Sequence, residues 1–74
     1  MTITKAPLLV YGMPDNLRYT LVRGPIRDLL KDNRIPAMWM PRLRGWTIRT
    51  ERIGDLIALA EIAGYVVRMR GPLQ

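Results

Sequence analysis

The first clear alternation of apolar and polar residues runs through Leu17, Tyr19 and Leu21, which occupy every second position. A period of two is expected of a strand that buries one of its faces. We therefore expect these three side chains to face a core, and Arg18 and Thr20 to face away from it.

The chain before this strand is less regular. A short apolar run from Leu8 to Tyr11 predicts a short edge strand. The stretch from Gly12 to Asn16 combines glycine, proline and an Asp-Asn pair, residues that favour a turn. We treat residues 1–16 as an N-terminal segment or edge strand.

A short helix is expected after the first strand. Gly24 and Pro25 end the strand, and a proline at a first helical position is favoured because its missing N–H would be unpaired there in any case. Apolar residues follow at helical spacing up to Asn33, which is suited to a left-handed C-cap. Pro36 separates this helix of two to three turns from the next element.

The segment 37–49 has the pattern of a β-hairpin. Its arms are expected at residues 38–40 and 46–48, each of which contains a tryptophan. The loop between them, residues 41–45, ends in a glycine, as a turn with one positive φ requires.

The clearest helix is predicted over residues 51–63. Thr50 supplies a capping oxygen, an apolar stripe repeats every three or four residues, and Gly64 follows as a C′ glycine. Alternating residues 65–70 then predict a last strand, which Gly71 and Pro72 end.

From residue 17 the expected order is strand, helix, strand, strand, helix, strand. This is the ferredoxin-like βαββαβ arrangement of the α+β class, with two helices on one face of a small antiparallel sheet. An additional N-terminal edge strand is compatible with it. At 74 residues the chain is expected to form a single domain, 1–74, with its core at 17–70 and a tail at 71–74.

Composition narrows the class of protein further. The chain has neither cysteine nor histidine, so disulfides and a structural zinc site are excluded as sources of stability. No apolar run approaches the roughly 20 residues of a membrane span. We expect a soluble, cytoplasmic protein without a membrane partner.

Residues for catalysis are scarce. There is no histidine for general-base chemistry, no cysteine nucleophile and no Walker-type glycine-rich loop. Two pairs of acids lie four residues apart on the expected helices, where such pairs normally face neighbouring arginines. We expect no enzyme, no catalytic or metal-binding residues and no cofactor.

The charge points instead to an anionic partner. The formal net charge is +6, and the basic residues are ten arginines and two lysines. Arginine suits phosphate and base recognition, although a GC-rich genome and a need for solubility would also favour it.

The strand phase predicts where this charge lies. If the helices cover the face of Leu21, Ile48 and Val67, a basic open face results, like the face with which ferredoxin-like RNA-binding domains hold bases and phosphates. Two arginines also occupy the hairpin tip. The candidate nucleic-acid-binding residues are Arg18, Trp39, Arg42, Arg44, Arg49, Arg68 and Arg70. A merely solvated sheet face and turn are the alternative explanation.

A family resemblance covers about residues 17–67. The string MWMPRLRGWTIRTERIGDLIALAEIAGYVV resembles a pattern of small, uncharacterised proteins of actinobacteria and actinophages. The order of elements is also similar to the HARP domain of annealing helicases, with Trp46 and the stripe at Leu56 and Ile57 as the shared positions. That resemblance implies DNA binding. It implies no helicase activity, because 74 residues hold no motor.

The leading hypothesis is a small non-enzymatic nucleic-acid-binding accessory protein of bacteriophage type, with DNA favoured over RNA as partner. The alternative is a protein-interaction module that binds an acidic surface of a host or partner protein, through an edge strand or through Met38, Met40 and Leu43. A third hypothesis is a homodimer in which the segment from Leu8 to Tyr11 pairs across a symmetry axis.

Overall fold

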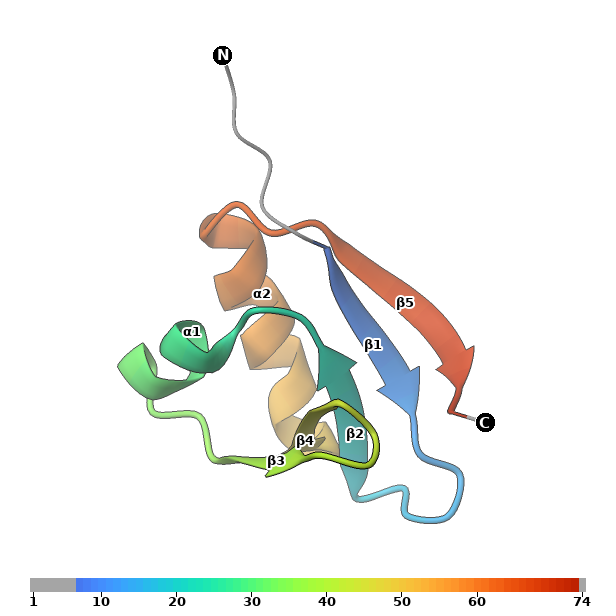
Figure 1. Ribbon diagram of the computed structural model, residues 1–74. Helices are drawn as coiled ribbons and strands as arrows, with labels where there is room; N and C mark the ends of the chain where they lie inside the picture. Colours follow the sequence, from blue (N-terminus) through green and yellow to red (C-terminus); the bar gives the residue numbers. More distant parts are fainter. Residues whose placement is uncertain (1–6, 74) are drawn as a thin grey trace.

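Five strands and two helices make up residues 7–73, the part of the chain that the computed structural model describes. Residues 1–6 and 74, which belong to the predicted N-terminal segment and tail, lie outside the described residues. Figure 1 labels the strands and helices. The strands are β1 (Leu8–Gly12), β2 (Tyr19–Arg23), β3 (Ala37–Met40), β4 (Gly45–Arg49) and β5 (Val67–Pro72). The helices are α1 (Arg27–Asp32), between β2 and β3, and α2 (Ile53–Ile62), which follows β4 after a 3-10 turn, η1 (Thr50–Arg52).

The predicted α+β class is confirmed, but the ferredoxin-like topology is only approximate. The strand order is β3-β4-β2-β1-β5. Strand β5 pairs with β1 in parallel, whereas every other pair is antiparallel, so the sheet is mixed. In the predicted arrangement the last strand would lie directly beside β2, and here β1 separates the two.

The predicted edge position of β1 is therefore wrong. Leu8 and Val10 are buried and Leu9 and Tyr11 are partly buried, so the continuous apolar run suits an interior strand whose two faces are both at least partly covered. The outer position falls to β5, where exposed arginines and a terminal proline are typical of an edge. With both of its sides paired, β1 also has no free edge for pairing with a second copy.

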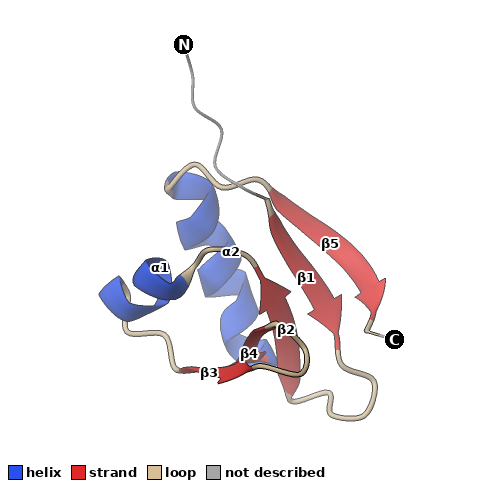
Figure 2. Ribbon diagram, in the orientation of Figure 1, coloured by secondary structure: helices blue, strands red, loops and turns tan. Residues whose placement is uncertain are grey.

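Both helices cover the same face of the sheet, as predicted (Figure 2). Leu30 of α1 and Leu56 and Ala60 of α2 belong to one buried cluster with sheet residues such as Val10 and Ile48. Trp46 is partly buried and packs against this cluster. No helix among residues 7–73 is long and apolar enough to cross a membrane.

The predicted phase of β2 is reversed. Leu17 lies in the turn before the strand and is exposed, while Thr20 and Val22 face the helices in register with β4 residues Ile48 and Trp46. Tyr19, Leu21 and Arg23 therefore point to the opposite face. Alternation could not reveal this phase, because the central strand is buried on both sides and Leu21 and Val22 are both fully buried.

Thr50 does not cap α2 as predicted. Its hydroxyl donates to the carbonyl oxygen of Leu17 at 2.8 Å, and the hydroxyl of Thr20 lies 3.0 Å from it. Since the one proton of Thr50 is used by Leu17, Thr20 donates this second hydrogen bond. Thr50 thus ties the beginning of α2 to β2, and the polar side chain of Thr20 is satisfied inside the core.

The C-terminal end of α2 matches the prediction, and the C-terminal end of α1 differs from it. Gly64 has φ +95° and follows α2 as expected. After α1 the left-handed residue is Arg34, with φ +53°, and not Asn33, whose φ is −101°. The Asn33 side chain instead donates to the Leu29 carbonyl at 2.9 Å.

We expect Arg34→Gly to raise the free energy of unfolding by about 1 kcal/mol, because a left-handed backbone costs about that much for a residue with a Cβ. Asn33→Gly is the control. Asn33 already has a negative φ, so glycine brings no advantage there, and the substitution removes the side-chain hydrogen bond to Leu29. Urea unfolding of both variants checks the difference. Equal destabilisation by the two would contradict it.

Candidate nucleic-acid interface

The sheet face opposite the helices is here called the open face. The β registers assign to it side chains of three kinds: aromatic rings, arginines and methionines. Residues of the open face include Tyr11, Tyr19, Arg23, Met38, Met40, Thr47, Arg49 and Arg68.

Tyr11 and Arg23 form the centre of the basic part of the open face. The Arg23 guanidinium lies over the Tyr11 ring, 4.8 Å from its centroid, and Nε donates to the Leu43 carbonyl oxygen at 2.9 Å. The guanidinium plane is thus held in place by an aromatic ring and by the β3–β4 loop. Arg68 of β5 lies on the same face. In the sheet register Leu9 of β1 pairs with Arg23 on one side and with Arg68 on the other, so the two arginines are two strands apart.

Tyr19 lies diagonally from Tyr11 on the same face. Tyr11 pairs with Leu21, so Tyr19 is two positions along the neighbouring strand, a separation of about 7–8 Å between Cα atoms. Neither tyrosine nor Arg23 was among the predicted binding residues. For Tyr19 the missed signal was the strand phase, since the reversed β2 moves it from the expected core side to the open face, where Arg23 also lies.

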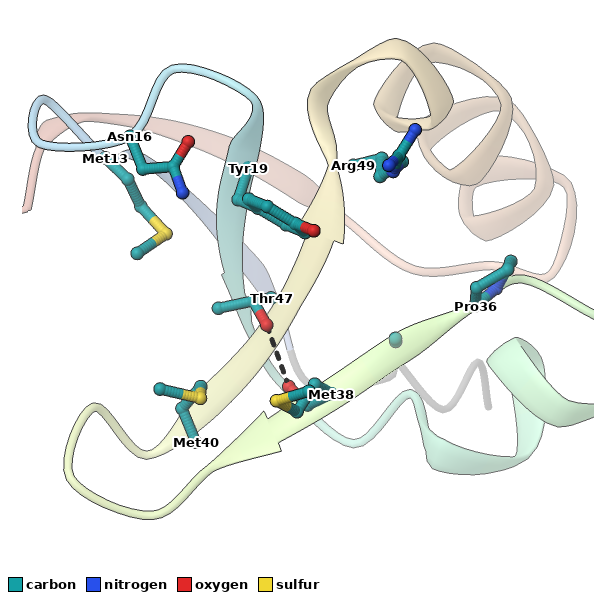
Figure 3. Close-up of a pocket in the computed structure, with 9 residues that line it drawn as sticks. Met13, Asn16, Tyr19, Pro36, Met38, Met40, Thr47 and Arg49 are labelled. Atoms are coloured by element: carbon teal, nitrogen blue, oxygen red, sulfur yellow. Dashed lines mark hydrogen bonds between the residues drawn. The ribbon is translucent and has the colours of Figure 1, made fainter.

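A hollow of about 500 Å³ adjoins Tyr19 at the β3 edge of the open face (Figure 3). Its walls come from the 13–16 turn, β2, β3 and β4. Lining residues include Met13, Asn16, Tyr19, Met38, Met40 and Arg49. The Thr47 hydroxyl at its floor donates to the Met38 carbonyl oxygen at 3.2 Å and is therefore already hydrogen-bonded (Figure 3). The rest of the hollow presents mainly apolar atoms, with other polar groups at its rim.

Arg49 stands at the rim of this hollow, paired with Glu51. Their closest side-chain atoms, Nη1 and Oε1, are 3.4 Å apart, and the two side chains are 61% and 70% exposed. The hydrogen bond that Arg49 donates to Glu51, followed by one with Tyr19, raises the pKa of the Arg49 guanidinium. An exposed pair of this length contributes little and is open to exchange for another anion.

The structure separates the other predicted arginines. Arg68 lies on the open face. Arg70 is two residues further along β5, at the point where the β1–β5 register shifts. Arg42 and Arg44 are exposed in the β3–β4 loop, whose Leu43 contacts Arg23. Arg18 precedes β2 and lines a smaller hollow with Arg49 and Glu51.

Trp39 is not on the open face, contrary to the prediction. It pairs with Trp46 across β3 and β4, and Val22 follows in the same row, which places all three on the helix side of the sheet. The two indole rings meet edge to face at 5.3 Å, and Trp39 remains 48% exposed. On β3, the side chains of Met38 and Met40 lie on the same face as Arg49, and Trp39 does not.

The β3–β4 loop also differs in its backbone. The positive φ predicted for the loop falls on Arg44, at +51°, whereas Gly45 is the first residue of β4. Gly45 is needed for space, since a Cβ there would lie 2.9 Å from Leu21 Cδ1 and 3.0 Å from the Val22 carbonyl oxygen.

No group of three metal-ligating side chains occurs within residues 7–73. Comparisons of the chain with protein-family models, with curated proteins and with solved structures found no match. The resemblances drawn from the sequence stay predictions.

Proposed function

We propose that this protein is a small, non-enzymatic, cytoplasmic nucleic-acid-binding protein that holds a single strand across its open face, with DNA favoured over RNA. One observation carries the proposal. Two tyrosines of the central strands lie diagonally on a solvent-accessible sheet face, next to arginines on three strands: Arg23, Arg49 and Arg68.

This combination matches the chemistry of a single strand. Bases stack on aromatic rings and on guanidinium planes, and each such contact typically contributes about 1–3 kcal/mol. Arg23 offers a guanidinium plane already supported by Tyr11, so a base stacked on it finds a preorganised partner. Arg68 and Arg70 are exposed, and so is the Arg49–Glu51 pair, so all three arginines are accessible to the phosphates at either side.

A fluorescence anisotropy titration with a labelled 12-nucleotide oligodeoxythymidine tests the proposal. We expect binding at 20 mM salt, with log K falling linearly with log salt. In the double variant Arg68→Gln, Arg70→Gln the slope should fall by about 1.4, because each lost phosphate contact on a single strand removes about 0.7.

The variant Arg27→Gln, Lys31→Gln is the matched control, because it removes the same charge from exposed positions on α1. It should leave the slope nearly unchanged. Equal slopes for the two variants would mean that net charge alone causes binding, and absence of binding at 20 mM salt would refute the proposal.

Glu51→Gln should strengthen binding of the same oligonucleotide about two- to five-fold. The carboxylate lies 3.4 Å from Arg49 and repels a phosphate that approaches this arginine. Glu61→Gln, an exposed position on α2, controls for the change in net charge. If Glu61→Gln strengthens binding as much as Glu51→Gln, Arg49 is not a contact.

A second candidate function is docking of a partner protein at the β3 edge. Strand β3 ends the sheet, and Met38 on it is 65% exposed, so an added strand from an acidic partner would cover both. A complex that survives nuclease and 0.5 M salt, and that is lost in Met38→Glu, would favour this function over nucleic-acid binding.

A further inference from the structure

The hollow beside Tyr19 has the composition of a small-ligand site. Its volume of about 500 Å³ falls within the range of about 300–1,000 Å³ that small-ligand pockets occupy. Apolar groups line most of it, and its few polar side chains are Thr47 at the floor and Asn16 and Arg49 at the rim. We infer that this hollow is a subsite for one nucleobase together with its phosphate, an inference that rests on the proposed function.

The apolar walls suit a flat aromatic ring. Tyr19 supplies an aromatic ring on one side, and Met13, Met38 and Met40 supply thioethers, which adapt to flat surfaces and contact aromatic rings favourably. Met13 comes from the 13–16 turn and the other two methionines from β3, so the ring would enter between these segments. Figure 3 shows the three methionines and Tyr19 around the same space.

Asn16 supplies a donor for the edge of the base. Its Oδ1 accepts the backbone N–H of Arg18 at 3.2 Å, which fixes the orientation of the amide. The other amide atom, Nδ2, is then turned toward the hollow (Figure 3). A primary amide donor in this position matches a carbonyl oxygen such as O2 or O4 of a pyrimidine or O6 of guanine.

Arg49 supplies the positive charge for the phosphate. It lines the hollow across from the 13–16 turn and lies beside a second small hollow, where Arg18 adds another guanidinium. Among residues 7–73, Glu51 is the only acid that lines either hollow, and its pairing with Arg49 is exposed and exchangeable. An apolar side chain of a partner protein would fill the methionine walls but would not accept from the Asn16 amide and would bring Arg49 no anion besides Glu51.

Methionine methyl groups give a direct readout of this site. Of the five methionines, Met13, Met38 and Met40 line the hollow, and Met69 lies on the helix-facing side of β5. In protein labelled at methionine methyls with carbon-13, titration with thymidine 5′-monophosphate should shift the three lining signals with one common dissociation constant. The Met69 signal should stay in place.

Two further ligands separate the base from the phosphate. Thymidine should produce the same shifts with at least five-fold weaker affinity, because Arg49 then has no anion to hold. Inorganic phosphate alone should leave the methionine methyls unshifted, since it does not reach the apolar walls.

Asn16→Asp tests the amide donor, because aspartate keeps the oxygen that accepts the Arg18 N–H while it replaces the donor. We expect at least ten-fold weaker binding of thymidine 5′-monophosphate. Leu17→Asp is the matched control: it adds the same charge one residue away at an exposed side chain and should weaken binding less than three-fold.

Three outcomes would overturn the inference. In the first, the oligonucleotide binds but the mononucleotide moves none of the three methyls, so the subsite is wrong while the proposed function stands. In the second, Asn16→Asp and Leu17→Asp weaken binding equally. In the third, the methyls respond to a partner protein and not to the nucleotide, which assigns the hollow to protein docking. If the mononucleotide shifts the methyls but no oligonucleotide binds, the inferred site stands and the strand-binding function fails.

Discussion

Tyr19→Leu is expected to weaken binding of the labelled oligodeoxythymidine by about five-fold or more, whereas Trp39→Leu should change it less than two-fold. Tyr19 lies on the open face and lines the hollow beside Arg49, and its loss removes a stacking contact of about 1–3 kcal/mol. Leucine keeps an apolar side chain at the start of β2, so the strand itself should be retained. Trp39 lies on the other face of the sheet.

The pair of variants distinguishes the two faces because each removes one partly exposed aromatic ring. Anisotropy at a single low salt concentration gives both dissociation constants, and circular dichroism confirms that each variant is folded. If Trp39→Leu weakens binding and Tyr19→Leu does not, the interface lies on the helix side of the sheet.

The second large effect concerns stability. Gly45→Ala should lower the free energy of unfolding by about 2 kcal/mol, because the new Cβ would lie 2.9 Å from Leu21 Cδ1 and 3.0 Å from the Val22 carbonyl oxygen. Neither neighbour has room to move, since Leu21 and Val22 are fully buried.

Gly54→Ala is the matched substitution. A Cβ at Gly54 meets nothing within 4 Å, and the residue lies in α2, where alanine is preferred over glycine. This variant should be more stable than the parent by about 0.5–1 kcal/mol. Thermal or urea unfolding compares the two, and similar effects of both substitutions would contradict the packing described for Gly45.

Much of the local structure was predictable from the sequence. The hairpin of β3 and β4, the helix over 53–62 with its closing Gly64 and the turn after Gly12 all carry signals that act over a few residues. Their outcome depends on backbone preferences and periodicity, which tertiary contacts did not override here. The capping of α2 was mispredicted because Thr50 has a long-range partner, Leu17, that no local pattern encodes.

The sheet order was not predictable in the same way. Which strand lies beside β2 is decided by long-range pairing, and the two candidates, β1 and β5, both have apolar residues at alternate positions. The continuous apolar run of β1, set against the arginines and the terminal Pro72 of β5, was the available indication. It favours β1 in the interior and β5 at the edge.

The candidate site was predicted in outline and corrected in its residues. A basic open face was expected, and Arg49 and Arg68 do lie there. The aromatic contribution was assigned to Trp39, whose phase is opposite to that of Met38 and Met40, while Tyr19 was expected on the core side with Leu17 and Leu21. Once Thr20 and Val22 turn toward the helices, Tyr19 and Arg23 reach the open face, and the tyrosines take the place proposed for the tryptophan.

The most direct test of the open face as the nucleic-acid interface is side-chain NMR with an unlabelled 12-nucleotide oligodeoxythymidine at 20 mM salt. We predict that the arginine Nε–Hε signals of Arg23, Arg49 and Arg68 shift on binding, while the indole N–H signals of Trp39 and Trp46 do not. Shifts of the indole signals and of α1 and α2 amides, with the three arginine signals unmoved, would contradict the account.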